Sequence, residues 1–99
     1  MTQATNVKNL SLYHFQACPF CARTRQVIDL LGLDIPKKDT RLKPAYRTEL
    51  VQQGGRSQVP CLKIETLDGQ TEWLYESSDI IKYLRANADI LSELNTQTA

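Results

Sequence analysis

The chain has 99 residues, 41% of them hydrophobic, and its twelve Lys and Arg against eleven Asp and Glu leave a net charge of +1. This length suits a single domain with one core, which we expect over residues 1–99 with the folded part at about 10–86. The near-neutral balance argues against nucleic acid or an anionic membrane as a partner.

The N-terminal segment MTQATNVKNL is polar and lacks the apolar run of a secretory signal, and no later stretch approaches the length of a membrane span. We therefore expect a cytoplasmic protein. In that reducing compartment three cysteines, an odd number, argue against a structural disulfide framework.

The first half of the chain predicts alternating strands and helices. Leu10–Phe15 (LSLYHF) is short, apolar and aromatic, as in a buried strand. A helix should follow from Pro19, which suits a first helical position, to Gly32, and its apolar stripe is Val27, Ile28 and Leu31. Residues 33–42 give a weaker strand signal, and Pro36 within them indicates an edge strand or an early break.

The second half predicts a helix, a hairpin and a closing helix. Residues 44–53 form the expected second helix, which Gly54 and Gly55 should end. VPCLKIETL reads as a strand, LDGQ as a turn and TEWLY as the returning strand. The last helix should start near Ser77, and Ile90, Leu91 and Leu94 could add a further helical turn or two. Parallel strands thus come first and an antiparallel hairpin last.

The motif CPFC places two cysteines where the first strand gives way to the first helix. Cys18 falls at the N-cap, where backbone N–H groups and the helix dipole stabilise a thiolate, the reactive form of cysteine. Cys21 lies one turn inside the helix, within reach of Cys18 but further from solvent. We therefore expect Cys18 to attack and Cys21 to resolve. Arg25 should lie on a solvated face, as charged helix residues usually do.

A metal site is the main competing interpretation of the cysteines. Cys61, with Cys18, Cys21 and His14, would give a Cys3His set that suits zinc. The usual zinc pattern has a second closely spaced ligand pair, which this chain lacks. We therefore expect no metal, with Cys61 as a small core residue and His14 as a strand residue satisfied by a neighbour. Trp73 and Tyr75 should pack on one face of a hairpin strand.

The segments CPFC (18–21), SQVP (57–60) and YESSDIIKYL (75–84), in this order and spacing, resemble those of the glutaredoxin family in the thioredoxin superfamily. The last two are also similar to the N-terminal domain of glutathione S-transferases. Thioredoxin itself has a tryptophan before a Gly-Pro pair in its motif. This chain has Ala17 before Pro19-Phe20, which favours the branch that uses glutathione.

This resemblance implies a thioredoxin-like α/β fold, a four-stranded mixed sheet flanked by helices, and a glutathione-dependent thiol–disulfide oxidoreductase with Cys18 and Cys21 as its catalytic residues. Pro60 should be cis, and Val59 should offer its backbone to the cysteinyl part of glutathione; a trans proline opening an edge strand is the alternative. The start of the last helix should hold the γ-glutamyl end, unless its residues only cap that helix. The implied glutathione contacts are Phe20, Arg47, Val59, Pro60, Ser77, Ser78 and Asp79.

One position departs from the family pattern. Many glutaredoxins have a lysine three residues before the first cysteine, where it supports the thiolate and the glycine carboxylate of glutathione, whereas this chain has Phe15. Arg47 matches a family position that helps to hold that carboxylate and could compensate. We expect a monomer whose partners are glutathione and glutathionylated or disulfide-containing proteins. An iron–sulfur carrier that uses Cys18 and glutathione is the alternative function, which the Pro-Phe pair disfavours.

Overall fold

A computed structural model describes residues 6–92. Its four strands form one sheet in the order β2-β1-β3-β4, in which β1 runs parallel to β2 and antiparallel to β3, and β3 pairs antiparallel with β4. This is the mixed sheet flanked by helices that the resemblance implied. The elements in chain order are β1 (Val7–His14), α1 (Pro19–Leu30), β2 (Lys37–Asp39), α2 (Pro44–Glu49), η2 (Leu50–Gly54), β3 (Cys61–Thr66), β4 (Thr71–Leu74) and α3 (Ser77–Ala86).

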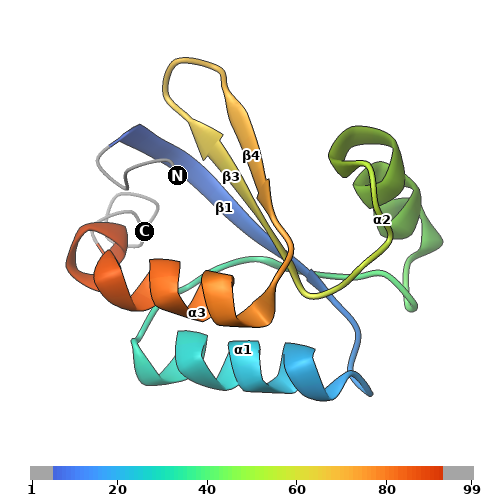
Figure 1. Cartoon of the computed structure of the whole chain (residues 1–99), viewed down its shortest axis with the longest axis horizontal. Coiled ribbons are helices and arrows are strands. Elements are labelled where there is room, and N and C mark those ends of the chain that lie inside the picture. Colours follow the sequence, from blue (N-terminus) through green and yellow to red (C-terminus); the bar gives the residue numbers. More distant parts are fainter. Residues whose placement is uncertain (1–5, 93–99) are drawn as a thin grey trace.

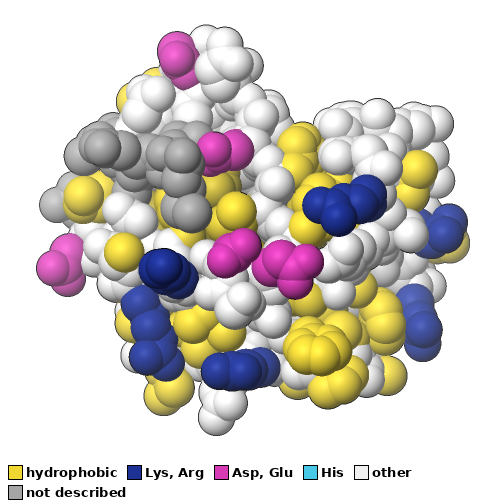
Figure 2. All heavy atoms as spheres, in the orientation of Figure 1, with side chains coloured by type: hydrophobic (Ala, Val, Ile, Leu, Met, Phe, Trp, Pro, Cys, Tyr) yellow, Lys and Arg dark blue, Asp and Glu magenta, His cyan; other side chains and the backbone are white. Residues whose placement is uncertain are grey.

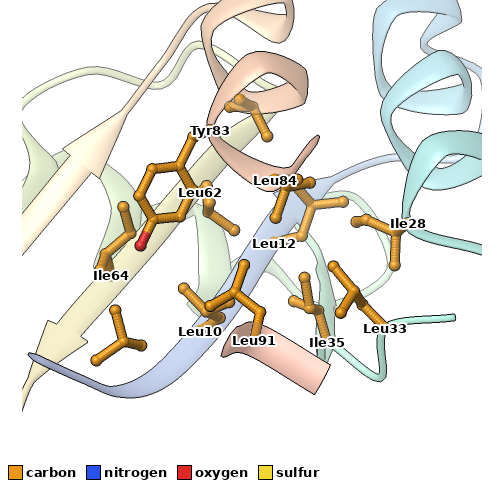
Figure 3. Packing of buried hydrophobic residues seen from close by; sticks show 12 residues of the cluster. Leu10, Leu12, Ile28, Leu33, Ile35, Leu62, Ile64, Tyr83, Leu84 and Leu91 are labelled. Atoms are coloured by element: carbon orange, nitrogen blue, oxygen red, sulfur yellow. The ribbon is translucent and has the colours of Figure 1, made fainter. Parts of the chain in front are cut away.

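One face of the sheet is aliphatic and is covered by α1 and α3, which lie side by side (Figure 1). Alternate residues of β1, Leu10 and Leu12, point to this face because successive side chains of a strand point to opposite sides. Figure 3 shows them packed with side chains from β3, α1, α3 and the segment after α1. The buried members are Val7, Leu10, Leu12, Ile28, Leu33, Ile35, Leu62, Ile64, Ile80, Tyr83, Leu84 and Leu91, which we call the aliphatic cluster.

The opposite face is aromatic and polar, and α2 and η2 approach it (Figure 1). Tyr13, from the other set of β1 side chains, is fully buried there and packs with Leu50, Cys61 and Tyr75. Tyr46, Val59 and Trp73 pack against this group, and we call all seven the aromatic cluster. The packing of Trp73 and Tyr75 confirms their prediction as hairpin packing residues.

Element boundaries differ from the sequence predictions at two places. β1 begins at Val7 rather than Leu10, because Val7 is buried and extends the pairing to Thr66 of β3. The second helix changes to a π-helical turn over η2 and ends at Gly55, whose φ of 96° favours glycine. Residues 88–92 form the expected extra helical turn, with Leu91 in the aliphatic cluster; Leu94 lies outside the described residues.

The edge strand and the hairpin follow the sequence predictions. β2 begins directly after Pro36 and lies at the edge of the sheet. The turn between β3 and β4 contains Gly69, whose φ of 85° lies in the left-handed region that glycine tolerates. Within residues 6–92, no helix is long and apolar enough to cross a membrane.

Candidate functional site

Three loops meet at one end of the sheet because of its strand register. Tyr13, near the end of β1, pairs with Cys61, the first residue of β3, and Leu62 pairs with Leu74, the last residue of β4. The segments that follow β1, precede β3 and follow β4 therefore leave the sheet at the same end. They carry Cys18, Pro60 and Ser77, so the sheet brings the three predicted motifs together.

Cys18 is the N-cap of α1, as the sequence predicted. Its extended backbone (φ −78°, ψ 118°) turns the side chain back so that Sγ accepts a hydrogen bond from the Cys21 N–H at 3.3 Å. This N–H belongs to the first helical turn, whose donors have no partner within the helix. A thiolate at Cys18 would gain this bond and the positive end of the helix dipole. Cys18 is 7% exposed, whereas Cys21 is fully buried.

The other two thiols are fully buried. Burial raises the pKa of Cys21, and its hydrogen bond with Cys18 raises it further. Burial also raises the pKa of Cys61 to about 12, and Cys61 is a core residue as predicted. All three cysteines are free thiols. Among residues 6–92, no group of three His, Cys, Asp or Glu side chains is placed to hold a metal ion.

Arg25 supports the turn that carries Cys18, so its predicted placement on a solvated face is wrong. Its side chain is half-buried and runs back along α1 to the end of β1. One guanidinium nitrogen lies 2.9 Å from Nδ1 of His14 and 3.4 Å from the carbonyl of Phe15, and the other donates to the carbonyl of Gln16 at 3.3 Å. The Phe15 carbonyl also accepts the N–H of Cys18 at 3.3 Å. His14 thereby has the neighbour that the sequence predicted for it.

The Val59–Pro60 peptide bond is cis, which confirms the isomer implied by the resemblance. The preceding segment is tied to the end of β4: the Arg56 N–H donates to the Tyr75 hydroxyl at 3.3 Å, and the Gln58 side chain donates to the Tyr75 carbonyl at 3.4 Å. Pro60 is buried and Val59 half-buried. Within the described part of the chain the backbone of Val59 forms no hydrogen bond, so its N–H and C=O can pair with an extended peptide.

The N-terminus of α3 faces the same end of the sheet with open donors. Its N-cap is Glu76, whose side chain makes no capping hydrogen bond. Ser77 is half-buried, and Ser78 and Asp79 are exposed. Acidic side chains lie near the junction of β4 and α3, and hydrophobic side chains gather over the N-terminal end of α1 (Figure 2). Phe20, beside the cysteines, is 62% exposed.

Two arginines of the second quarter of the chain differ in their surroundings, and the predicted contact of Arg47 with glutathione stays a prediction. Arg47 lies on the exposed surface of α2 and, within residues 6–92, forms no hydrogen bond or ion pair with the three loops. The guanidinium of Arg41 instead lies 3.9 Å from the ring centre of Phe15. The sequence did not predict a role for Arg41, because a contact between distant segments leaves no local pattern.

A family model described as the N-terminal domain of glutathione S-transferases matches residues 12–93. The chain belongs to this family. Prostaglandin E synthase 2 of Mus musculus is 33% identical over 81 residues, a match that covers 82% of this chain and 20% of that protein. The chain therefore spans about a fifth of the length of this curated relative.

Solved structures of a maleylacetoacetate isomerase and of a glutaredoxin share the fold of this chain. Maleylacetoacetate isomerase from Anaeromyxobacter dehalogenans, with bound dicarboxyethyl glutathione and citrate in its active site, is 27% identical with a TM-score of 0.64, over 85% of this chain and 39% of that one. The buckwheat glutaredoxin–glutathione complex is 18% identical with a TM-score of 0.63, over 93% and 82%. The fold is thus the thioredoxin-like fold of glutaredoxins and glutathione S-transferase N-terminal domains.

Proposed function

We propose that the chain is a glutathione-dependent thiol–disulfide oxidoreductase that reduces protein–glutathione mixed disulfides or small disulfides. The observation that carries the proposal is the asymmetry of the two motif cysteines. Cys18 caps α1 and accepts the Cys21 N–H, whereas the Cys21 thiol is fully buried and has a raised pKa. One sulfur is therefore placed to attack as a thiolate while the other stays protonated.

The reaction begins when the Cys18 thiolate attacks the glutathione sulfur of a mixed disulfide. An S–S bond forms between Cys18 and glutathione as the original S–S bond breaks, and the protein thiolate leaves and takes up a proton. A second glutathione thiolate then attacks this new disulfide, which gives glutathione disulfide and regenerates the Cys18 thiolate. Alternatively, Cys21 loses its proton and attacks Cys18, which releases glutathione and leaves an internal disulfide.

The three loops supply the proposed contacts to glutathione. Val59 would pair its backbone with the cysteinyl residue beside Pro60, and Phe20 would cover the substrate next to Cys18. The open N–H groups at the start of α3 would receive the γ-glutamyl carboxylate, and Asp79 its ammonium, with Ser77 and Ser78 beside them. The glutathione groups bound in the isomerase and in the buckwheat glutaredoxin support this ligand class. A cytoplasmic monomer that acts on glutathionylated proteins fits this chemistry.

The direct test is reduction of a glutathionylated peptide by glutathione, coupled to NADPH consumption through glutathione reductase. We expect turnover that depends on both the chain and glutathione. Rates equal to those of the uncatalysed reaction would overturn the proposal. Visible absorbance of the freshly purified protein separates the iron–sulfur alternative, because a bound cluster absorbs there and the oxidoreductase does not.

A further inference from the structure

An arginine is fixed beside the cysteine turn on an aromatic platform. The Arg41 guanidinium lies over the Phe15 ring at 3.9 Å from its centre, within the range of a cation–π interaction. Phe15 is part of the turn itself, because its carbonyl accepts the N–H of Cys18 and a hydrogen bond from Arg25. The position at which the sequence indicated a missing cation therefore has one stacked on it.

The loop that carries Arg41 is anchored at several points. The Asp39 carboxylate accepts the backbone N–H groups of Arg41 and Leu42, both at 2.9 Å. Thr40 donates its N–H to the His14 carbonyl at 2.9 Å, and its hydroxyl bonds to the same oxygen at 3.3 Å. These bonds fix the loop to the end of β1, directly before Phe15. The stacked side chain of Arg41 therefore starts from a fixed backbone.

The guanidinium is free to bind an anion. Arg41 is exposed, and no ion pair formed within residues 6–92 includes it. Stacking uses only the flat face of a guanidinium, so the N–H donors at its edge remain directed outward in the fork that matches a carboxylate. Asp39, the nearest acid in the loop, already accepts two backbone N–H groups.

We propose that Arg41, held on the ring of Phe15, binds the glycine carboxylate of the glutathione joined to Cys18. The inference rests on the proposed function for the class of ligand. Glutathione has two carboxylates, and the start of α3 provides for the γ-glutamyl one. The glycine carboxylate lies at the other end of the tripeptide, and Arg41 offers it a cation on the strand-β1 side of Cys18. Phe15 acts as a positioning residue, which orients the guanidinium and does not touch the ligand.

The test removes the Arg41 guanidinium and the glycine carboxylate separately and together, and measures the affinity each time. Isothermal titration calorimetry compares S-methylglutathione with its glycine amide, which lacks only that negative charge. We expect the amide to bind wild type about fivefold more weakly, as for an exposed charge-assisted contact. Arg41→Gln should bind the acid about fivefold more weakly than wild type does and should not distinguish acid from amide. Phe15→Leu should shift in the same direction.

Matched variants make the test specific. Arg85→Gln removes an equal charge from the last turn of α3 and should keep the wild-type preference for the acid. If the preference for the acid survives in Arg41→Gln but is lost in Arg47→Gln, Arg47 of α2 binds the carboxylate and the proposal is overturned. Equal affinities of wild type for acid and amide would also overturn it. Normal binding without turnover in the coupled assay would instead contradict only the oxidoreductase function.

Discussion

The two faces of the sheet are built from different chemistry. The aliphatic cluster under α1 and α3 consists of Leu, Ile and Val side chains with the single polar-tipped Tyr83. The aromatic cluster under α2 includes Tyr13, whose hydroxyl donates to the Glu49 carboxylate. Lys38, outside the cluster, pairs with the same carboxylate at 3.0 Å. Apolar burial is non-directional, whereas hydrogen bonds and ring contacts fix positions.

The two faces therefore contribute differently: the aliphatic face mainly stabilises the fold, and the aromatic face also positions the loops of the candidate site. The aliphatic cluster joins the two helices to the sheet and supplies most of the apolar burial. On the aromatic face, Tyr75 holds the loop before Pro60, and the Tyr13 hydroxyl, through Glu49, ties the end of α2 to β1. We therefore expect changes on the first face to act on the free energy of unfolding, and changes on the second to act also on glutathione binding.

The largest effect should come from Leu12→Ala in the aliphatic cluster. Leu12 is fully buried in the central strand β1, so truncation leaves a cavity and should lower the free energy of unfolding by about 2–5 kcal/mol. Chemical denaturation measures this loss. Turnover per folded molecule should stay near wild type, and a large loss of turnover in the folded fraction would contradict the separation of the two faces.

A smaller effect is expected from Glu49→Ala on the other face. The variant leaves the buried Tyr13 hydroxyl without its carboxylate and Lys38 without its ion pair. The free energy of unfolding should therefore fall by about 1–2 kcal/mol. Because α2 loses this tie, affinity for S-methylglutathione should fall as well. Glu65→Ala is the control, since Glu65 pairs with Lys63 only at 4.0 Å near the surface and should change neither quantity.

Tyr83→Phe should stabilise the aliphatic cluster. The Tyr83 hydroxyl is buried and has no hydrogen-bond partner within the described residues, and burial raises its pKa to about 12. Removal of the hydroxyl keeps the ring and relieves an unsatisfied polar group, so the free energy of unfolding should rise by up to about 1 kcal/mol. Denaturation of the two proteins side by side measures the change; a clear loss would show that the hydroxyl has a partner.

The smallest effect is a pH dependence that comes from His14. Burial and the adjacent Arg25 and Lys37 lower the pKa of His14, and the opposing influence of Asp39 is weaker. The unfolded chain therefore binds the proton first as pH falls below about 6.5. Stability from this group is complete above that pH and is lost as pH falls toward the lowered value. Denaturation between about pH 7.5 and 5.5 should show this loss, and His14→Gln should flatten it.

Local signals explain what the sequence predicted correctly. Pro19 and Gly32 bound α1, Cys18 is its N-cap, and the Asp-Gly turn closes the hairpin, because each depends on backbone preferences of a few adjacent residues. The resemblance implied that the three motifs contact one ligand, and the strand register places them at one end of the sheet.

Contacts between distant segments explain what the sequence did not predict. Arg25 reaches His14, and Arg41 stacks on Phe15, through approaches that only the folded sheet creates. Gly54 likewise lies so close to Tyr75 and Trp73, which are distant in the sequence, that a Cβ at this position would meet both side chains. These features carry no periodicity or capping signal along the chain.

The measurement that tests the central claim most directly is the mass of the chain after reaction with a glutathionylated peptide. In Cys21→Ser the resolving thiol is absent, so we expect one glutathione per chain, which peptide mapping should locate on Cys18. Cys18→Ser should remain unmodified, because the Cys21 and Cys61 thiols are buried and have raised pKa values. Equal modification of both variants, or glutathione located on Cys61, would contradict the assignment of Cys18 as the attacking sulfur.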